Sequence, residues 1–250
     1  STRGLGSLVH NGSAIIDIGL ASPLSGGTAL FDVGGNLTLD GTLNVSNIGG
    51  MGNGIYRIFD YAGGLTDSGL VYGSLPSGVT SADLTLQTAL ANQVNLLVSS
   101  PNLVIQFWDG SQSIANGLVD GGSGVWNSAG TNWTDINGLV NSAWGGTFAV
   151  FQAPGGDVTV QGSQTVNGMQ FVDNGYRLLA GTGGALNLIN GSSGDTSVRV
   201  DPGVTATLDL PLNGSGTLNK LDSGILVLNG NNSYSRGATL SGGTIVGGGN

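Results

Sequence analysis

The sequence contains no cysteine and no glutamate, and its 250 residues include one lysine, Lys220, and one histidine, His10. Without cysteine the chain has no disulfide framework and no thiolate metal site, and a single histidine cannot complete a zinc site. We therefore expect neither a metal ion nor a cofactor. A chain without thiols is also suited to crossing an oxidising compartment unfolded, because no cysteines can pair prematurely on the way.

Charge is scarce as well: charged residues make up 8% of the chain, about a third of the usual share. The formal net charge is −9 and the six basic residues are scattered, so they form no patch that could neutralise phosphate groups. Nucleic acid and anionic membrane surfaces are therefore poor candidate partners. No apolar run approaches the ~18 residues that span a bilayer, and the first residues have no signal-peptide pattern. We expect an excised or mature segment that inserts into no membrane.

The shortage of helix-forming residues predicts an all-β chain. Glutamate and lysine build many surface helices, and the 48 glycines each cost a helix interior about 1 kcal/mol relative to alanine. Short alternating runs rich in Leu, Val, Ile and Thr predict strands instead. These runs are 14–18, 36–46, 56–61, 83–88, 94–99, 157–162, 185–190, 197–200 and 206–212. Asn-Gly and Gly-Gly steps between them accept the positive φ angles of tight turns.

Self-similarity favours one arrangement of these strands. The segments GNLTLDGTLNVS, GGALNLINGSSGDTSVRV and GSGTLNKLDSGILVLNG repeat a Gly-x-Leu-x-Leu pattern, as stacked repeats do. We expect a right-handed parallel β-helix, a solenoid of ~20 residues per turn that buries its inward Leu and Val side chains. A two-sheet sandwich is the alternative that the strand pattern leaves open.

All four tryptophans lie between residues 99 and 151, where repeated turn signals interrupt the pattern. We expect this stretch to form short antiparallel hairpins or widened loops, a Trp-rich excursion from a single β-helix over residues 1–250. Exposed aromatic side chains stack on sugars and dominate binding hot spots, whereas a buried tryptophan fills a core. The candidate partner-binding residues are Trp108, Trp126, Trp133 and Trp144, and core packing is the alternative that their residue type favours.

Catalytic groups are hard to assemble from this sequence. A glycosidase needs two carboxylates that face one cleft, but the aspartates occur singly in turns. The best paired candidates are Asp60 with Asp67 and Asp195 with Asp201. The Asp-Ser-Gly steps at 67–69 and 222–224 resemble the surroundings of a serine-protease nucleophile, but His10 is the one histidine that could serve as their base. We expect no catalytic residues and no enzyme activity.

Residues 214–245, GSGTLNKLDSGILVLNGNNSYSRGATLSGGTI, resemble the passenger-associated transport repeat of bacterial autotransporters, also called the autotransporter-associated β-strand repeat. Asp222 and Arg236 depart from the repeat pattern, and we expect both in turns. Residues 34–76 and 124–162 are also similar to passenger segments of these proteins. The residues that match the repeat are Gly214, Gly216, Leu218, Lys220, Gly224, Leu226, Leu228, Gly230, Asn232, Tyr234, Gly237, Thr239, Gly243 and Ile245.

The resemblance implies a parallel β-helix passenger of a type V secretion system. Such a passenger is exported through the outer membrane by a C-terminal β-barrel translocator, which is absent from this sequence, and it stays on the bacterial cell surface or is secreted. The implied function is a non-catalytic adhesin or adhesin stalk. Its partners would be a host cell-surface or matrix protein, a glycan, or like cells through self-association. Two alternatives stay open: a released virulence effector that engages a host receptor, and a pectate-lyase-like carbohydrate-active enzyme.

Overall fold

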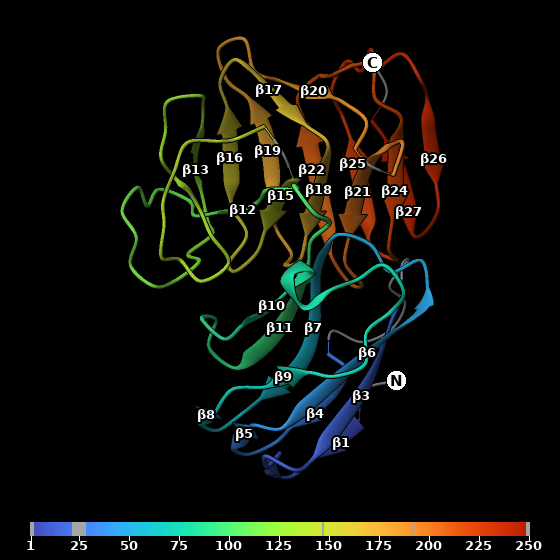
Figure 1. Ribbon diagram of the computed structural model, residues 1–250. Coiled ribbons are helices and arrows are strands. Elements are labelled where there is room, and N and C mark those ends of the chain that lie inside the picture. Colours follow the sequence, from blue (N-terminus) through green and yellow to red (C-terminus); the bar gives the residue numbers. More distant parts are fainter. Residues whose placement is uncertain (1–2, 22–28, 147, 192, 249–250) are drawn as a thin grey trace. The chain divides into compact units, whose positions relative to one another are not determined.

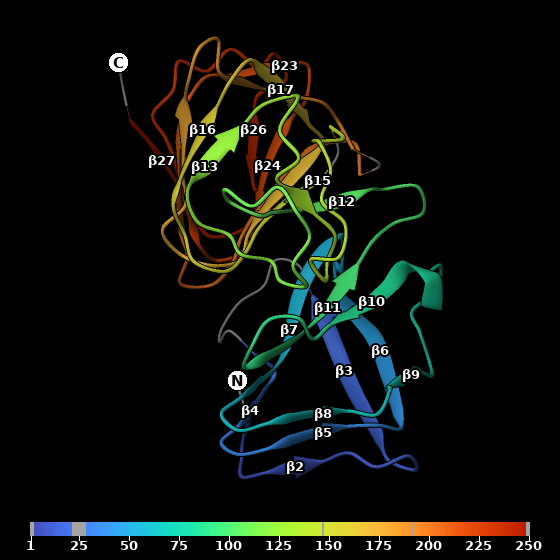
Figure 2. The same cartoon turned by 90° about the vertical axis from the view of Figure 1, so that its left-hand side faces the viewer.

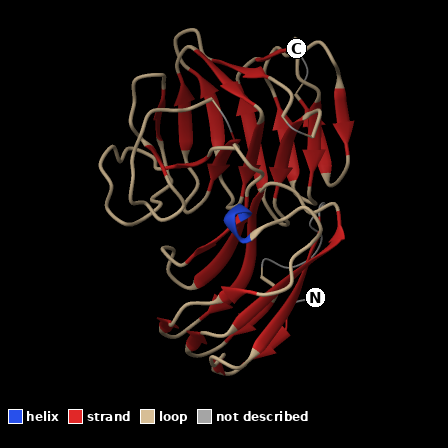
Figure 3. Cartoon of the chain, in the orientation of Figure 1, coloured by secondary structure: helices blue, strands red, loops and turns tan. Residues whose placement is uncertain are grey.

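The computed structural model describes residues 3–21, 29–146, 148–191 and 193–248. The chain forms two compact units, and the main boundary between them lies between Pro101 and Asn102. Within the described residues the fold is all-β apart from one 3-10 helical turn, η1 (Ser81–Asp83) (Figure 3). No helix in this part of the chain is long and apolar enough to cross a bilayer. The expectation of one domain over residues 1–250 stays a prediction.

Unit 1 arranges its strands in three sheets that the chain visits in turn. β1, β4 and β7 pair in parallel in one sheet, β2, β5 and β8 in a second, and β3, β6 and β9 in a third. Figure 2 shows β2, β5 and β8 stacked in this order. An antiparallel hairpin of β10 and β11 extends the first sheet beyond β7. The strands are β1 (Arg3–Leu5), β2 (Leu8–Val9), β3 (Ile15–Ala21), β4 (Phe31–Val33), β5 (Leu37–Leu39), β6 (Thr42–Gly49), β7 (Gly54–Tyr61), β8 (Leu65–Asp67), β9 (Val71–Tyr72), β10 (Leu84–Gln87) and β11 (Gln93–Val98).

Unit 2 repeats this plan, and two of its three sheets have more strands than the sheets of unit 1 (Figure 1). One sheet has the order β14-β12-β15-β18-β21-β24-β26, a second β13-β16-β19-β22-β25-β27, and a third β17-β20-β23. The pairing is parallel except where β14 joins β12. The strands are β12 (Ile105–Trp108), β13 (Gly124–Trp126), β14 (Trp133–Thr134), β15 (Phe148–Phe151), β16 (Asp157–Val160), β17 (Ser163–Val166), β18 (Gly168–Phe171), β19 (Arg177–Ala180), β20 (Ala185–Leu188), β21 (Thr196–Val200), β22 (Thr205–Asp209), β23 (Leu212–Gly214), β24 (Leu218–Leu221), β25 (Ile225–Leu228), β26 (Ala238–Leu240) and β27 (Thr244–Gly247).

Parallel pairing between consecutive turns of the chain is consistent with the predicted parallel β-helix, and it is not the antiparallel pairing of a two-sheet sandwich. All nine predicted strand runs overlap strands. The length of a turn varies more than the sequence indicates. Phe148 lies opposite Gly168, as a turn of ~20 residues predicts, but Phe31 lies opposite Phe59 and Gly168 opposite Ser197. Loops between the strands absorb the additional residues.

The core of unit 2 consists of columns of apolar side chains that point inward from successive turns. Val158, Leu178, Leu208 and Leu228 occupy equivalent positions in β16, β19, β22 and β25, and all four are buried. Alternate residues of these strands face outward, which is the period of two that the sequence shows. Each fully buried leucine stabilises the fold by roughly 1.5–3 kcal/mol relative to an exposed one.

Truncating one member of this column should destabilise unit 2. For Leu208→Ala we expect the free energy of unfolding to fall by about 2–5 kcal/mol. The neighbouring strands, which carry Leu178 and Leu228, are held by their own pairing and cannot collapse into the cavity. The matched variant Thr207→Ala, one residue away on the outer face, should change it by less than about 0.5 kcal/mol. Tryptophan fluorescence during urea unfolding reports on unit 2 alone, since all four tryptophans lie there. Equal losses in the two variants would contradict the inward assignment.

Candidate functional site

The structure brings the four predicted tryptophans together in the core of unit 2. Trp108, Trp126 and Trp133 come from β12, β13 and β14, and Trp144 follows β14. The ring centroids of Trp126 and Trp133 lie 4.8 Å apart, and those of Trp133 and Trp144 lie 4.5 Å apart. Phe151 continues the cluster, 5.7 Å from Trp133. The pairs are tilted or edge-to-face, as the quadrupoles of aromatic rings favour.

Burial decides what these rings can contact. Trp108, Trp126 and Trp133 are 0% exposed, and Trp144 is partly buried. The indole nitrogen Nε1 of Trp108 donates to Gly122 O at 2.8 Å, and that of Trp144 donates to Thr165 O at 2.9 Å. Partner binding through the four rings stays a prediction. Of the four, only Trp144 could contact a partner without rearrangement of the core.

Buried polar side chains hold together the turns around this cluster. Asp109 is 0% exposed, and its carboxylate accepts hydrogen bonds from Asp120 N and Asn141 Nδ2, both at 2.8 Å. Burial raises the pKa of the Asp109 carboxyl. Asn132 Nδ2 donates to Gly110 O at 2.7 Å. Because these bonds join residues far apart in the sequence, the loops form one connected structure over the aromatic core.

A second buried polar cluster lies at the turn between β24 and β25. Lys220 is 0% exposed, and its Nζ donates to Leu221 O at 2.6 Å, Asp222 O at 2.8 Å and Gly242 O at 3.2 Å. The Asp222 carboxylate accepts a hydrogen bond from Arg199 Nε at 2.8 Å. Burial lowers the pKa of Lys220 to about 8, although the negative charge of Asp222 raises it in part. The lysine therefore joins the turns of two successive windings of the chain.

The structure places both residues that depart from the repeat pattern in turns, as the sequence predicts. Arg236 is exposed. Asp222 has a φ of 64°, a left-handed backbone that few residues other than glycine and asparagine adopt, and its side chain is buried rather than solvated. The sequence does not predict its ion pair with Arg199, because only the stacking of β21 and β24 brings Arg199 beside the turn that holds Asp222.

Replacing this lysine should loosen the turns that it joins. In Lys220→Met three buried carbonyl groups lose a charged donor, so we expect the free energy of unfolding of unit 2 to fall by roughly 1–3 kcal/mol. Chemical denaturation followed by tryptophan fluorescence measures the loss. Arg236→Met removes a positive charge from an exposed turn of the same segment and should leave stability unchanged. If Lys220→Met were as stable as the wild type, the hydrogen bonds of Lys220 would not be what stabilises these turns.

Alkaline pH should stabilise unit 2 through the same residue. The folded-state pKa of Lys220 is about 8 and the ordinary value is 10.5, so between these values the unfolded chain keeps a proton that the folded chain has released. Stability then rises with pH. Between about pH 7.5 and pH 9.5 the free energy of unfolding of the wild type should rise relative to that of Lys220→Met. A constant difference between the two proteins would show that the amine does not titrate in this range.

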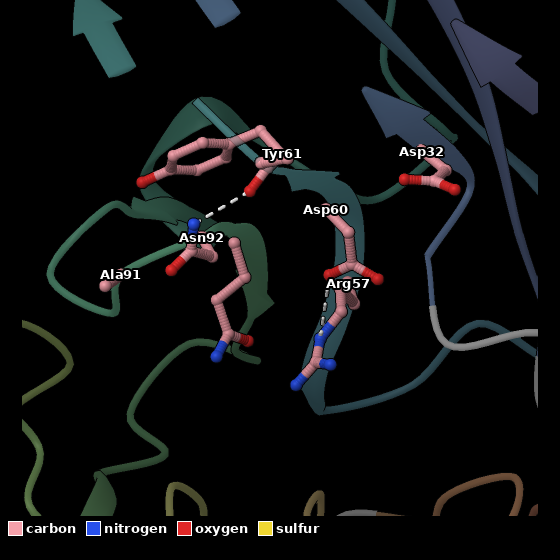
Figure 4. Close-up of a pocket in the computed structure, with 8 residues that line it drawn as sticks. Asp32, Arg57, Asp60, Tyr61, Ala91 and Asn92 are labelled. Atoms are coloured by element: carbon pink, nitrogen blue, oxygen red, sulfur yellow. Dashed lines mark hydrogen bonds and ion pairs between the residues drawn. The ribbon is translucent and has the colours of Figure 1, made fainter. Parts of the chain in front are cut away.

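A polar hollow lies on the surface of unit 1, outside both buried clusters (Figure 4). It is open and has a volume of about 350 Å³. Asp32 of β4 lies opposite Asp60 of β7, and Asp60 lies opposite Gln93 of β11, so these three side chains form one row across neighbouring strands. The full lining is Asp32, Arg57, Asp60, Tyr61, Ala62, Ala91, Asn92 and Gln93.

A β-bulge in β7 places an arginine beside this row. The register between β7 and β11 shifts between Val94 and Asn95, which leaves Ile58 without an opposite residue. In a regular strand, residues three apart point to opposite faces, and the extra residue of a bulge returns them to the same face. Arg57 Nε therefore lies 3.8 Å from Asp60 Oδ1, as Figure 4 shows.

The structure does not place the two members of either candidate carboxylate pair next to each other. Asp60 and Asp67 lie in different sheets, and the carboxylate in register with Asp60 is that of Asp32. Asp195 and Asp201 flank β21 at its opposite ends. Among the described residues, no group of three or more His, Cys, Asp or Glu side chains could hold a metal ion.

The single histidine occupies a buried position in unit 1. His10 is 4% exposed, and neither of its ring nitrogens has a hydrogen-bond partner within the described part of the chain. The arrangement that a serine nucleophile needs, with its hydroxyl hydrogen-bonded to the histidine, is therefore not present at His10.

Comparison with known proteins identifies the chain. The model of the passenger-associated-transport-repeat matches residues 218–246, which contain β24 to β26 and most of β27 and overlap the predicted repeat at 214–245. The adhesin BmaC autotransporter of Brucella suis biovar 1 (strain 1330) is 38% identical over 224 residues, or 82% of this chain. The chain is an autotransporter passenger segment. It spans 6% of the length of that relative. No solved structure matches the passenger segment.

Little in the sequence of this passenger segment indicates the hollow. Asp60 is a candidate acid on sequence grounds, but β4, which carries Asp32, is three residues long, too short for an alternating pattern to predict it. Arg57 and Asp60 are three residues apart, a spacing that indicates opposite faces of a strand. A bulge cannot be read from this alternation, so the sequence carries no signal that Arg57 and Asp60 share a face.

Proposed function

We propose that this passenger segment belongs to a surface-exposed or secreted adhesin, and that it serves as a binding surface or as the stalk that carries one, without catalysis. The observation that supports the proposal is the 38% identity, over most of the chain, to a relative named as an adhesin. The proposed partner is a host cell-surface or matrix component, or a like cell.

The outer surfaces of both units suit a stalk. Asn44 Nδ2 donates to Asp17 Oδ1 at 2.8 Å in unit 1. In unit 2, Asn219 Nδ2 donates to Asp195 Oδ2 at 2.6 Å, and Ser241 Oγ donates to Asn219 Oδ1 at 2.8 Å. Such bonds link side chains on adjacent turns, so the polar surface itself helps to keep the turns in register. Local stacking of this kind also lets a chain fold turn by turn.

The fold proposal that accompanies this function is a right-handed parallel β-helix over residues 1–250, with residues 99–151 as a Trp-rich excursion. Parallel strands joined within one sheet are connected in the right-handed sense in about 98% of cases. We therefore infer that hand for the parallel connections of each unit.

Binding of the purified 250-residue chain to host cells, to matrix proteins and to itself tests the function. We expect saturable binding to at least one of these surfaces, blocked by excess unlabelled chain and lost when the chain is unfolded. If the folded chain binds none of them, the segment is deleted from the full-length protein and the adhesion of the remaining protein is measured. Reduced adhesion after deletion supports a stalk, and unchanged adhesion contradicts the proposal.

A further inference from the structure

We propose that the hollow of unit 1 binds the terminal sugar residue of a neutral glycan. The inference rests on the proposed adhesin function and names the class of ligand for one part of its surface. The hollow lies in a row of polar side chains from β4, β7 and β11, and it is shaped by the bulge that turns Arg57 toward Asp60. Bulges often re-aim a side chain in this way beside functional sites.

The hollow offers both hydrogen-bond acceptors and donors to a ligand. Asp32 is exposed, and its carboxylate has no hydrogen-bond or ion-pair partner within the described residues. Asn92 uses Nδ2 to donate to Tyr61 O at 3.0 Å, which leaves its Oδ1 as an acceptor. Gln93 accepts from Asn95 Nδ2 through Oε1 at 3.1 Å, which leaves its amide nitrogen as a donor.

Hydroxyl groups fit this mixture because each one both donates and accepts a hydrogen bond. The vicinal hydroxyls of a sugar ring can donate to the Asp32 carboxylate while they accept from the Gln93 amide. An ammonium group has donors alone, so it would leave the Gln93 amide without an acceptor. A phosphate or carboxylate ligand has acceptors alone and would approach two carboxylates, those of Asp32 and Asp60, with one guanidinium to offset them. An uncharged polyhydroxylated ligand is therefore the best match.

Size and shape restrict the ligand further. A volume of about 350 Å³ lies at the lower end of the ~300–1,000 Å³ typical of small-molecule sites. The hollow is also open, so it covers one face of a ligand and leaves the remainder in solvent. Both features suit one sugar residue at the end of a longer chain, as a glycan on a cell surface presents it.

Titration of the folded 250-residue chain with methyl glycosides of neutral hexoses and N-acetylhexosamines tests this proposal, with ligand-observed NMR as the readout. We expect saturable binding of at least one glycoside with a Kd in the ~mM range, because a small open site covers few ligand atoms. Asp32→Ala and Gln93→Ala should each weaken it by about tenfold, since each removes a direct hydrogen bond to the ligand. Asp157→Ala removes the same charge from an exposed position of β16 in unit 2 and should bind as the wild type does.

The outcomes separate this inference from the adhesin function. No glycoside binding, or equal binding by wild type and Asp32→Ala, would overturn the sugar site. Binding of methylammonium in its place, lost in Asp32→Ala, would also overturn it and identify a cation site. If Asp32→Ala binds cells as well as the wild type while the wild type binds glycosides, the hollow is not what the adhesin uses. Circular dichroism of each variant confirms that it is folded.

Discussion

The in-register stacking of parallel strands is the constraint on which the rest of the passenger segment depends. Each inner strand pairs its N–H and C=O groups with the turns before and after it, so no turn is complete without its neighbours. Stacking also puts each side chain beside the equivalent side chain of the next turn, about 4.8 Å away. Like charges in that arrangement repel one another. This gives a physical reason for a chain in which 8% of residues are charged, with amides and hydroxyls in most outward positions.

The charged groups that do occur are found in two kinds of surroundings, one buried and one exposed. At the corner after β24, Lys220 and the Arg199–Asp222 pair are buried, and each has hydrogen-bond partners. The buried lysine is tolerated because the carbonyl oxygens of Leu221, Asp222 and Gly242 accept hydrogen bonds from its Nζ. On the surface of unit 1 the register instead sets Asp32 beside Asp60, and the bulge brings Arg57 to the same face. The first arrangement stabilises the stack, whereas the second leaves hydrogen-bonding groups open to a ligand.

The aromatic cluster belongs to unit 2, whereas the open polar hollow is lined by residues of unit 1. The tryptophan cluster is one part of the core of unit 2, and hydrogen bonds of Asp109 and Asn132 hold together the loops around it. The hollow is small and polar and comes from strands with no unusual composition. The proposed adhesin function is compatible with a weak site of this kind, because many weak contacts made in parallel bind strongly together.

The sequence by itself determined the all-β class, the positions of most strands, the absence of a cysteine framework and the passenger repeat near the C-terminal end of the chain. These properties follow from local patterns: a period of two, glycine at turns, and spacing within one repeat. The tertiary structure decided which residues meet across turns. Asp222 reaches Arg199, the four tryptophans share one core, and Asp32, Asp60 and Gln93 form one row. Those contacts depend on the length of each turn and on one bulge, and neither is encoded in the alternation of any single strand.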